Sequence, residues 1–468
     1  MQKRNLLIII LFLFTGTIGW SAERIRQNFD FDWQFRLGEQ GIYKPVQLPH
    51  DWSIELDFNE EVGPESGYLP GGIGYYKKDF NVPASYKGKR VSIVFDGIYH
   101  KATIYLNGQE VDYHRYGYTS FETDLTPYLK YGGKNTLSVK VDHSEKSRWY
   151  TGSGIYRHVW MQVTNPIHVK MWGTYITTPR VSAESAIVSC VTTVANTSAL
   201  TGEIEIMQRI VDAQGNLLKI NGKQYAARTE VVMPENGTKD IAQSFTLSNP
   251  QLWNLEKPYL YRLETILKQK GKVIDRYTTR FGVRTIGFDK DKGFFLNGKN
   301  IKMKGACLHQ DAGCLGVAVP NRSYERRLTI LKEFGANAIR CSHNPPSPEF
   351  LNYCDSIGFL VVDEAFDKWK SGYYEQFFDE CWQQDIRDMI VRDRNHPSIV
   401  LWSIGNELAE ATRKDNVGVE RATLLRDFVH KLEPTRPTML ALAPAYQDKF
   451  ASVTDVVGYN YSELSYIE

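Results

Sequence analysis

The sequence predicts a multidomain protein, in which two β-sandwiches precede a parallel sheet covered by helices. Three observations lead to this fold class. The chain has 468 residues, which is too long for one ordinary domain. Up to about residue 284, short alternating apolar runs are separated by turn residues, as in β-sandwiches. After Gly287, apolar strands alternate with amphipathic helices, a rhythm typical of a parallel sheet.

The first 21 residues have the pattern of a signal peptide. Lys3 and Arg4 precede an unbroken apolar run from Leu6 to Phe14, and small residues favour cleavage after Ser21. The run is too short to span a bilayer as a mature helix. We therefore expect secretion across the inner membrane to the periplasm or the exterior, with no membrane span left after signal removal.

The charge balance and the cysteine spacing argue against nucleic-acid binding, a disulfide framework and a zinc site. Lys and Arg number 56 and Asp and Glu 54, so the formal net charge is +2, and no basic stripe suggests a nucleic-acid partner. The six cysteines contain no CxxC pair and are unevenly spread, with Cys190 alone and five between Cys307 and Cys381. This spacing favours free, mostly buried thiols over a disulfide framework or a zinc site.

Residues 22–166 are expected to form the first sandwich. Arg90–Phe95, Ala102–Leu106 and Thr136–Val141 are predicted strands, and Asn107-Gly108 is a strong hairpin signal. Residues 167–286 continue at sandwich spacing, and their length suits an immunoglobulin-like domain.

Residues 287–468 should contain six strands with helices between them. The predicted helices are 323–334, 348–357, 377–394 and 419–432. The predicted strands are 301–308, 336–342, 359–365, 398–404, 438–442 and 453–459.

Polar residues cluster where these strands end. His309 and Asp311 follow the first strand, His343 the second, and Asn406-Glu407 the fourth. Asp363-Glu364 ends the third strand, and Asn460-Tyr461 follows the sixth. Because the carboxyl ends of parallel strands meet at one edge of a sheet, these groups should form a single site.

Several stretches resemble glycoside hydrolase family 2. The segment Arg394–Glu407, RNHPSIVLWSIGNE, looks like the family signature, and the resemblance covers the whole mature chain. Further matching stretches are Leu48–Trp52, Gly152–Arg157, Leu296–Lys299 and Arg340–His343. The resemblance implies a jelly-roll-like sugar-binding domain, an immunoglobulin-like β-sandwich and a (β/α)8 catalytic barrel.

The resemblance also implies roles. Glu407 matches the family's general acid/base, whose work near neutral pH calls for a raised pKa. Asn406 matches a residue that binds the sugar 2-hydroxyl, and Tyr461 matches a tyrosine beside the nucleophile. His309 and His343 match residues that line the family's sugar pocket. We expect Asp311, which lies beside His309 in the sequence, to bind substrate as well. Arg340 is expected to hold the barrel mouth together, and the Trp149–Gly152 loop to approach that mouth.

Two departures from the family pattern matter. Where some members carry a magnesium-binding Glu-Thr-His-Gly, this chain has lysines at Lys368 and Lys370, so we expect no metal there and no other cofactor. The barrel region has about 180 residues, against about 250 for a whole barrel. We therefore expect the chain to be truncated within the barrel, with the nucleophilic glutamate beyond Glu468.

The expected function is retaining hydrolysis of terminal β-galactosides, with a carbohydrate as the partner and oligomerisation possible. Two alternatives stay open. The sugar specificity could be that of a β-glucuronidase or β-mannosidase of the same family. The chain could instead be an inactive fragment that only binds carbohydrate.

Overall fold

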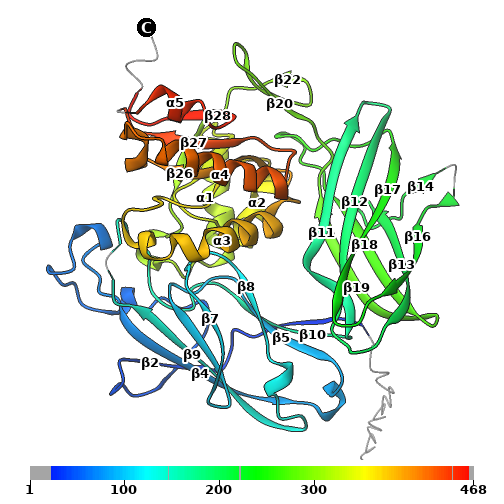
Figure 1. Ribbon diagram of the computed structural model, residues 1–468, viewed down its shortest axis with the longest axis horizontal. Coiled ribbons are helices and arrows are strands. Elements are labelled where there is room, and N and C mark those ends of the chain that lie inside the picture. The colour runs from blue at the N-terminus through cyan, green and yellow to red at the C-terminus, as the bar shows by residue number, and fades with distance from the viewer. Residues whose placement is uncertain (1–22, 146, 221–222, 445, 463–468) are drawn as a thin grey trace, which may run out of the picture.

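A computed structural model describes residues 23–145, 147–220, 223–444 and 446–462 (Figure 1). Two all-β regions precede a parallel sheet with helices, which confirms the predicted fold class. The predicted signal segment, residues 1–21, lies outside the described residues. Within the described part of the chain, no helix combines the length and apolar character needed to cross a bilayer.

The first region is a sandwich of two antiparallel sheets. Their strand orders are β3-β2-β4-β9-β6-β7 and β1-β10-β5-β8. The predicted Asn107-Gly108 turn joins β6 to β7, with both residues at positive φ as such hairpins require. The bounds are β1 Ile25–Asn28, β2 Trp33–Leu37, β3 Lys44–Val46, β4 Gly72–Val82, β5 Arg90–Phe95, β6 Ala102–Leu106, β7 Gln109–His114, β8 Phe121–Asp124, β9 Gly133–His143 and β10 Val159–Thr164.

The second region packs a three-stranded sheet, β11-β12-β17, against a four-stranded one, β16-β13-β18-β19. Alternate residues of β17 are buried, as expected of a sheet with one solvent face. A meander of β20, β21 and β22 leads into the next region. The bounds are β11 Ile167–Val181, β12 Ser185–Asn196, β13 Gly202–Val211, β14 Lys219–Ile220, β15 Lys223–Gln224, β16 Ala227–Met233, β17 Gly237–Ser248, β18 Tyr261–Gln269, β19 Lys272–Phe281, β20 Ile286–Asp289, β21 Gly293–Leu296 and β22 Lys299–Asn300.

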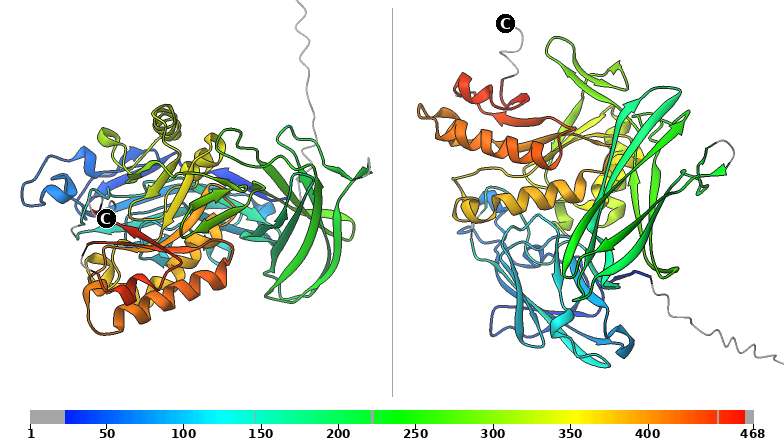
Figure 2. Two further views of the ribbon diagram at one scale, coloured as in Figure 1. Left: turned by 90° about the horizontal axis from the view of Figure 1, so that it is seen from above. Right: turned by 45° about the vertical axis from the view of Figure 1, so that its right-hand side comes forward.

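The third region contains the six predicted strands, all parallel and in chain order. They are β23 Gly305–Leu308, β24 Ala338–Cys341, β25 Leu360–Glu364, β26 Ile399–Asn406, β27 Thr438–Leu442 and β28 Val456–Tyr459. β23 starts later than residue 301, because the backbone N–H of Ile301 bonds to Phe294 in the meander instead. β23 and β28 stand at the two edges of the described sheet, which is open rather than closed (Figure 2).

The helices lie over the parallel sheet at the predicted places. α2 has the predicted bounds because both ends carry strong signals: Ser347 caps Phe350 N at 3.2 Å, Pro348 begins the helix, and Gly358 ends it in the left-handed conformation. The bounds are α1 Asn321–Glu333, α2 Pro348–Ile357, α3 Phe378–Asp393, α4 Val417–Leu432 and α5 Asp448–Ala451.

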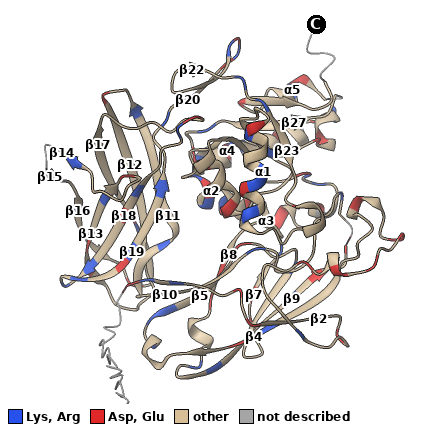
Figure 3. Cartoon of the chain, turned by 180° about the vertical axis from the view of Figure 1, so that it is seen from behind, with Lys and Arg blue, Asp and Glu red and all other residues tan. Residues whose placement is uncertain are grey.

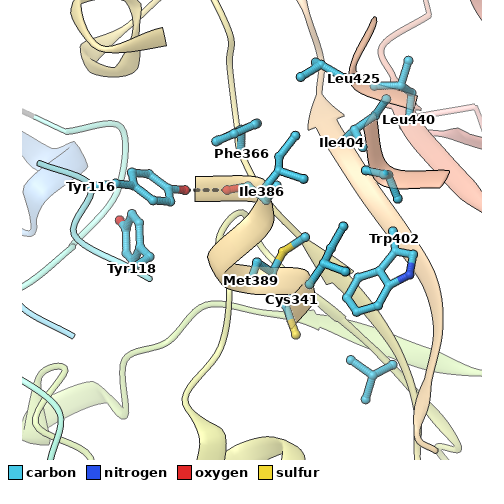
Figure 4. Close-up of a cluster of buried hydrophobic side chains, with 14 of the residues drawn as sticks. Tyr116, Tyr118, Cys341, Phe366, Ile386, Met389, Trp402, Ile404, Leu425 and Leu440 are labelled. Atoms are coloured by element: carbon cyan, nitrogen blue, oxygen red, sulfur yellow. Dashed lines mark hydrogen bonds between the residues drawn. The ribbon is translucent and has the colours of Figure 1, made fainter. Parts of the chain in front are cut away.

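One apolar core joins the first sandwich to the barrel. Tyr116 and Tyr118 of the sandwich pack against Phe366, beside α3 residues such as Ile386 (Figure 4). The Tyr116 hydroxyl donates to the carbonyl of Ala365 at 2.5 Å. Three thiols are buried (Cys190, Cys341 and Cys354), Cys381 is half-buried, and Cys307 and Cys314 are exposed. All six are free as expected, but only half are buried.

The immunoglobulin-like region is attached to the barrel through the family signature. Asn395 donates to Thr174 O at 2.7 Å and accepts from Ile176 N at 2.9 Å, so its side chain pairs with β11 like a short strand. His396 lies 2.6 Å from Asp355, whose carbonyl accepts the indole N–H of buried Trp253 at 2.8 Å. Part of the signature therefore serves domain attachment rather than chemistry.

Asn395→Ala should lower the free energy of unfolding by about 1–3 kcal/mol, because two backbone groups of β11 lose their partner. Chemical denaturation would measure the change. Asn81→Ala, at an exposed position of β4, is the matched control and should stay within about 0.5 kcal/mol of the parent. Equal losses in both variants would contradict the attachment role.

Candidate active site

Glu407 follows β26, where the carboxyl ends of the parallel strands meet. Its φ of +48° turns the chain sharply, and its N–H donates to Ala441 O of β27 at 2.7 Å. The turn directs the carboxylate towards β28, where Oε1 accepts from the Asn460 amide at 2.8 Å. The side chain is 17% exposed, so solvent and substrate can reach it.

The pKa of Glu407 shifts in the opposite direction to the one expected of a general acid. Burial pushes its pKa upward, but hydrogen bonds from Asn460 and Tyr461, together with the cations Lys368 and Arg148, outweigh that effect. The pKa of Glu407 is therefore lowered, whereas the sequence analysis expected it to be raised. A carboxyl group surrounded by donors and cations is more stable ionised.

Asn406 is fully buried beside Glu407. Its Oδ1 accepts from Arg340 at 2.9 Å and from Asn460 at 3.1 Å, and its Nδ2 donates to Asp367 at 2.9 Å. These bonds fix which way the amide points. Lys368 donates to the Asn406 carbonyl at 2.7 Å, so the backbone is fixed as well.

Glu364 is the buried carboxylate around which the strand ends are arranged. It accepts from Arg340 Nε at 2.9 Å and from Ser403 Oγ at 2.6 Å, and its other oxygen lies 2.6 Å from His343 Nδ1. Arg340 therefore holds the barrel mouth together, as predicted. Asp363 points to the other face of β25, where burial and then Asp393 raise its pKa well above the usual range.

The two predicted histidines meet a tryptophan from the first sandwich. The Trp149 ring lies 5.3 Å from that of His309 and 5.7 Å from that of His343, and the two imidazoles are 5.6 Å apart, edge to face. Gln310 donates to Thr151 O at 3.2 Å. The expected approach of the Trp149–Gly152 loop to the barrel mouth is confirmed. Burial, then the neighbouring His343, lowers the pKa of His309.

Buried Asp51 fastens this loop to the barrel. Its carboxylate accepts from Tyr150 OH at 2.5 Å, Ser153 N at 2.9 Å, Ser53 N at 3.1 Å and, from the barrel, Val317 N at 3.0 Å. Gly152 has a φ of +64° and no room for a side chain: a Cβ there would lie 2.0 Å from Val317 Cγ2 and 2.7 Å from Asp51 Oδ2. Burial raises the pKa of Asp51.

The remaining predicted residues lie at the rim. Tyr461 is 74% exposed, and its hydroxyl hydrogen-bonds to Glu407. Asp311 accepts from Gly313 N at 3.0 Å, so its carboxylate caps its own loop, and its charge acts on nearby His309. The Asp311 carboxylate thus accepts a hydrogen bond from its own turn rather than from Asn406.

Three charged residues that were not predicted as part of the site are brought to it by the fold. Asp367 accepts from Asn406 and lies 2.8 Å from Arg148 Nε, while Lys368 lies 3.3 Å from Asp367 and 3.9 Å from Glu407. Arg148 comes from the first sandwich, more than 200 positions away along the chain. No local pattern could identify that pairing, although the two lysines after β25 were noticed as a departure.

A cavity of about 150 Å³ opens beside these charges, between the sandwich and the barrel. It is smaller than a typical ligand site, but it has the aromatic lining with a few polar groups that such sites share. Among the described residues, no three His, Cys, Asp or Glu side chains are grouped as metal ligands would be. The lining consists of Tyr116, Tyr118, Ser147, Arg148, Trp149, His343, Phe366, Asp367, Lys368, Ser371, Gly372 and Tyr374.

Three family descriptions match consecutive parts of the chain. Residues 31–166 match the sugar-binding domain of glycosyl hydrolases family 2, residues 167–284 the family's central domain, and residues 289–464 its TIM barrel domain. The chain belongs to glycoside hydrolase family 2. The incomplete barrel of the described structure is thus the start of a family 2 TIM barrel.

Family 2 relatives extend over most of this chain. A β-galactosidase of Bacteroides ovatus, BoGH2A, is 41% identical over 94% of the chain and 57% of its own length. A β-glucuronidase of Bacteroides fragilis is 30% identical over 92% of the chain and 63% of its own length. A family 2 crystal structure from Bacteroides cellulosilyticus has a TM-score of 0.88 at 39% identity, over 93% of this chain and 58% of that one. The chain spans about three fifths of these relatives.

Gly152→Ala should disturb the site through the loop it shapes. The added Cβ meets Val317 and Asp51, and the left-handed backbone alone costs about 1–3 kcal/mol in a residue with a side chain. We expect lower stability on denaturation and a changed Trp149 fluorescence, because the indole moves away from His309. Gly88→Ala has the same strained backbone, at a φ of +85°, but nothing within 4 Å of its Cβ. A fluorescence change of the same size in both variants would contradict the role of the loop.

Proposed function

We propose that this family 2 protein acts in retaining hydrolysis of terminal β-galactosides, with Glu407 as general acid/base. The observation that carries the proposal is Glu407 at the end of β26, reachable from solvent and placed beside the fixed amide of Asn406. Such hydrolysis needs a group that protonates the leaving oxygen and later deprotonates water. In this proposal Glu407 serves both steps, and the sugar lies against Asn406, His309 and His343, of which His343 lines the cavity.

The charge balance of the site supports a neutral sugar. Arg148 and Lys368 are the cations nearest the cavity mouth, and both pair with Asp367, while Lys368 also faces Glu407. A uronate would need a cation of its own to offset its desolvation. The same two cations are the observation that favours the second candidate, a β-glucuronidase, because a substrate carboxylate could compete with Asp367 for Arg148.

Retention requires a second carboxylate about 5–5.5 Å from the acid/base. Glu364 is bound by Arg340, His343 and Ser403, and Asp367 by Arg148 and Asn406, so neither is free to attack. We propose that the nucleophile follows a further barrel strand outside the described residues. The residues that the structure describes should by themselves only bind sugar, which keeps the alternative of a non-catalytic fragment testable.

We also propose that the protein is exported, on the basis of the charged and apolar pattern of residues 1–21. Protein expressed with and without this segment, followed by cell fractionation, would test the proposal. Export that does not depend on the segment would contradict it.

The substrate proposal is tested with 4-nitrophenyl β-galactoside, β-glucuronide and β-mannoside. They should be assayed on the chain as printed and on a chimera that continues it with the matching C-terminal region of BoGH2A. We expect turnover of the galactoside by the chimera and little by the chain as printed. A preference of the chimera for the glucuronide would replace the galactoside proposal.

Glu407→Gln should affect substrates according to their leaving groups. Glycosides with poor leaving groups need the proton and should lose about 100-fold or more in kcat/KM, whereas activated aryl glycosides should lose much less in the first step. Steady-state kinetics with aryl galactosides of graded leaving-group pKa would measure the trend. Glu420→Gln, at an exposed position of α4, is the matched control and should leave the whole series unchanged. Equal losses across the series would rule out the acid role.

A further inference from the structure

The ammonium group of Lys368 lies between two carboxylates of the site. It is 3.3 Å from Asp367 Oδ1 and 3.9 Å from Glu407 Oε2. It also donates to the Asn406 carbonyl at 2.7 Å, and only 12% of the side chain is exposed. The cation is therefore held in place by the backbone that carries Glu407, and does not depend on either carboxylate alone for its position.

We propose that Lys368 is a positioning residue for the reaction, a fixed counter-ion that holds Glu407 between its proton-donating and proton-accepting forms. This inference rests on the proposed role of Glu407. The chain supplies the cation from the segment after β25, directly across from the acid at the end of β26. Lys370, two residues on, pairs instead with Asp379 on α3 and is not placed to act in this way.

Other groups face Glu407 from the remaining elements. Asn460 and Tyr461 donate hydrogen bonds from the segment after β28, and Arg148 adds a more distant positive charge from the first sandwich. Asp367 is the opposing charge, and it is already paired with Arg148 and Asn406. Among the residues that the structure describes, Lys368 is thus the cation within ion-pair distance of both carboxylates. Its removal would leave two anions in the site with no cation between them.

The two half-reactions make opposite demands on Glu407. In the first, its carboxyl proton passes to the glycosidic oxygen as the bond from that oxygen to C1 breaks and the nucleophilic carboxylate bonds to C1. In the second, the Glu407 carboxylate takes a proton from the water that attacks C1 and displaces that nucleophile. A nearby cation stabilises the ionised form, so it disfavours the first step and favours the second. Burial lowers the pKa of Lys368 itself, although Asp367 opposes this.

The test measures the ionisation of Glu407 directly and does not need turnover. Carbon-13 NMR of carboxyl-labelled glutamate would follow its titration in the full chain, with the resonance assigned by its absence from Glu407→Gln. Lys368→Met should raise the pKa of Glu407 by roughly one pH unit, since an opposite charge at this distance is removed. Lys368→Arg keeps the charge and should restore the parent value to within a few tenths of a unit.

Lys370→Met is the matched control and should leave the titration unchanged. Lys368→Gln, which removes the charge but keeps a hydrogen-bond donor, replaces the methionine variant if circular dichroism shows that the methionine variant does not fold. A titration that is unchanged in both Lys368→Met and Lys368→Gln, or one that moves equally in Lys370→Met, would overturn the proposal.

In an active chain, the basic limb of the pH dependence of kcat/KM should move to higher pH by the same amount in Lys368→Met. An NMR shift together with a pH profile that does not move would overturn the positioning role. The pKa of Glu407 could shift in Lys368→Met while neither the chain nor the chimera hydrolyses any glycoside. That result would keep Lys368 as the counter-ion of Glu407 and would reject the proposed function instead.

Discussion

The active-site edge of the barrel depends on one buried carboxylate, that of Glu364. A charge without exposure to water is tolerated only when it is paired and hydrogen-bonded. Arg340 of β24, Ser403 of β26 and His343 supply those partners, so three neighbouring strand ends are held at fixed spacing. Arg340 also donates a hydrogen bond to the Asn406 amide oxygen, so the position of that amide depends on the same group of residues. Removing one partner would leave a buried charge uncompensated, which is why these residue types occur together.

A second constraint joins the domains. Asp51 binds the sandwich loop and the barrel loop in one set of hydrogen bonds, and the backbone of Gly152 fits only because it has no side chain. The loop in turn places Trp149 against the two histidines. The pocket is therefore shared between domains, and several stretches that resemble the family, including Asn395-His396, serve attachment as much as chemistry.

Cations and anions both lie near Glu407. Over the whole cartoon, Lys and Arg are interspersed with Asp and Glu rather than gathered in one domain (Figure 3). The lowered pKa of Glu407 describes a site open to solvent. A bound sugar excludes water, and a second carboxylate in a retaining pair repels the ionised form; both effects raise the pKa of an acid. Under the proposed mechanism, the cation at Lys368 limits that rise, so Glu407 acts as the base in the second half of the reaction.

Much of this architecture was predictable from local pattern. The two periodicities separate sandwich from barrel, and the start and stop signals of α2 give its bounds to the residue. The end of β26 was identified as the site because polar residues follow an apolar strand at Asn406-Glu407. These features depend on residues that are close together in the sequence, so they can be predicted without knowing the tertiary structure.

The sequence alone thus determined the family, the six parallel strands and the sheet edge at which the candidate site lies. The tertiary structure decided which charges act together: Glu364 rather than Asp363 faces the barrel interior, Lys368 rather than Lys370 reaches Glu407, and Arg148 meets Asp367 from another domain. It also decided that hydrogen-bond donors and cations together outweigh burial in setting the pKa of Glu407. Electrostatic energies depend on distance and burial in space, and partners far apart in the chain leave no periodic trace in the sequence.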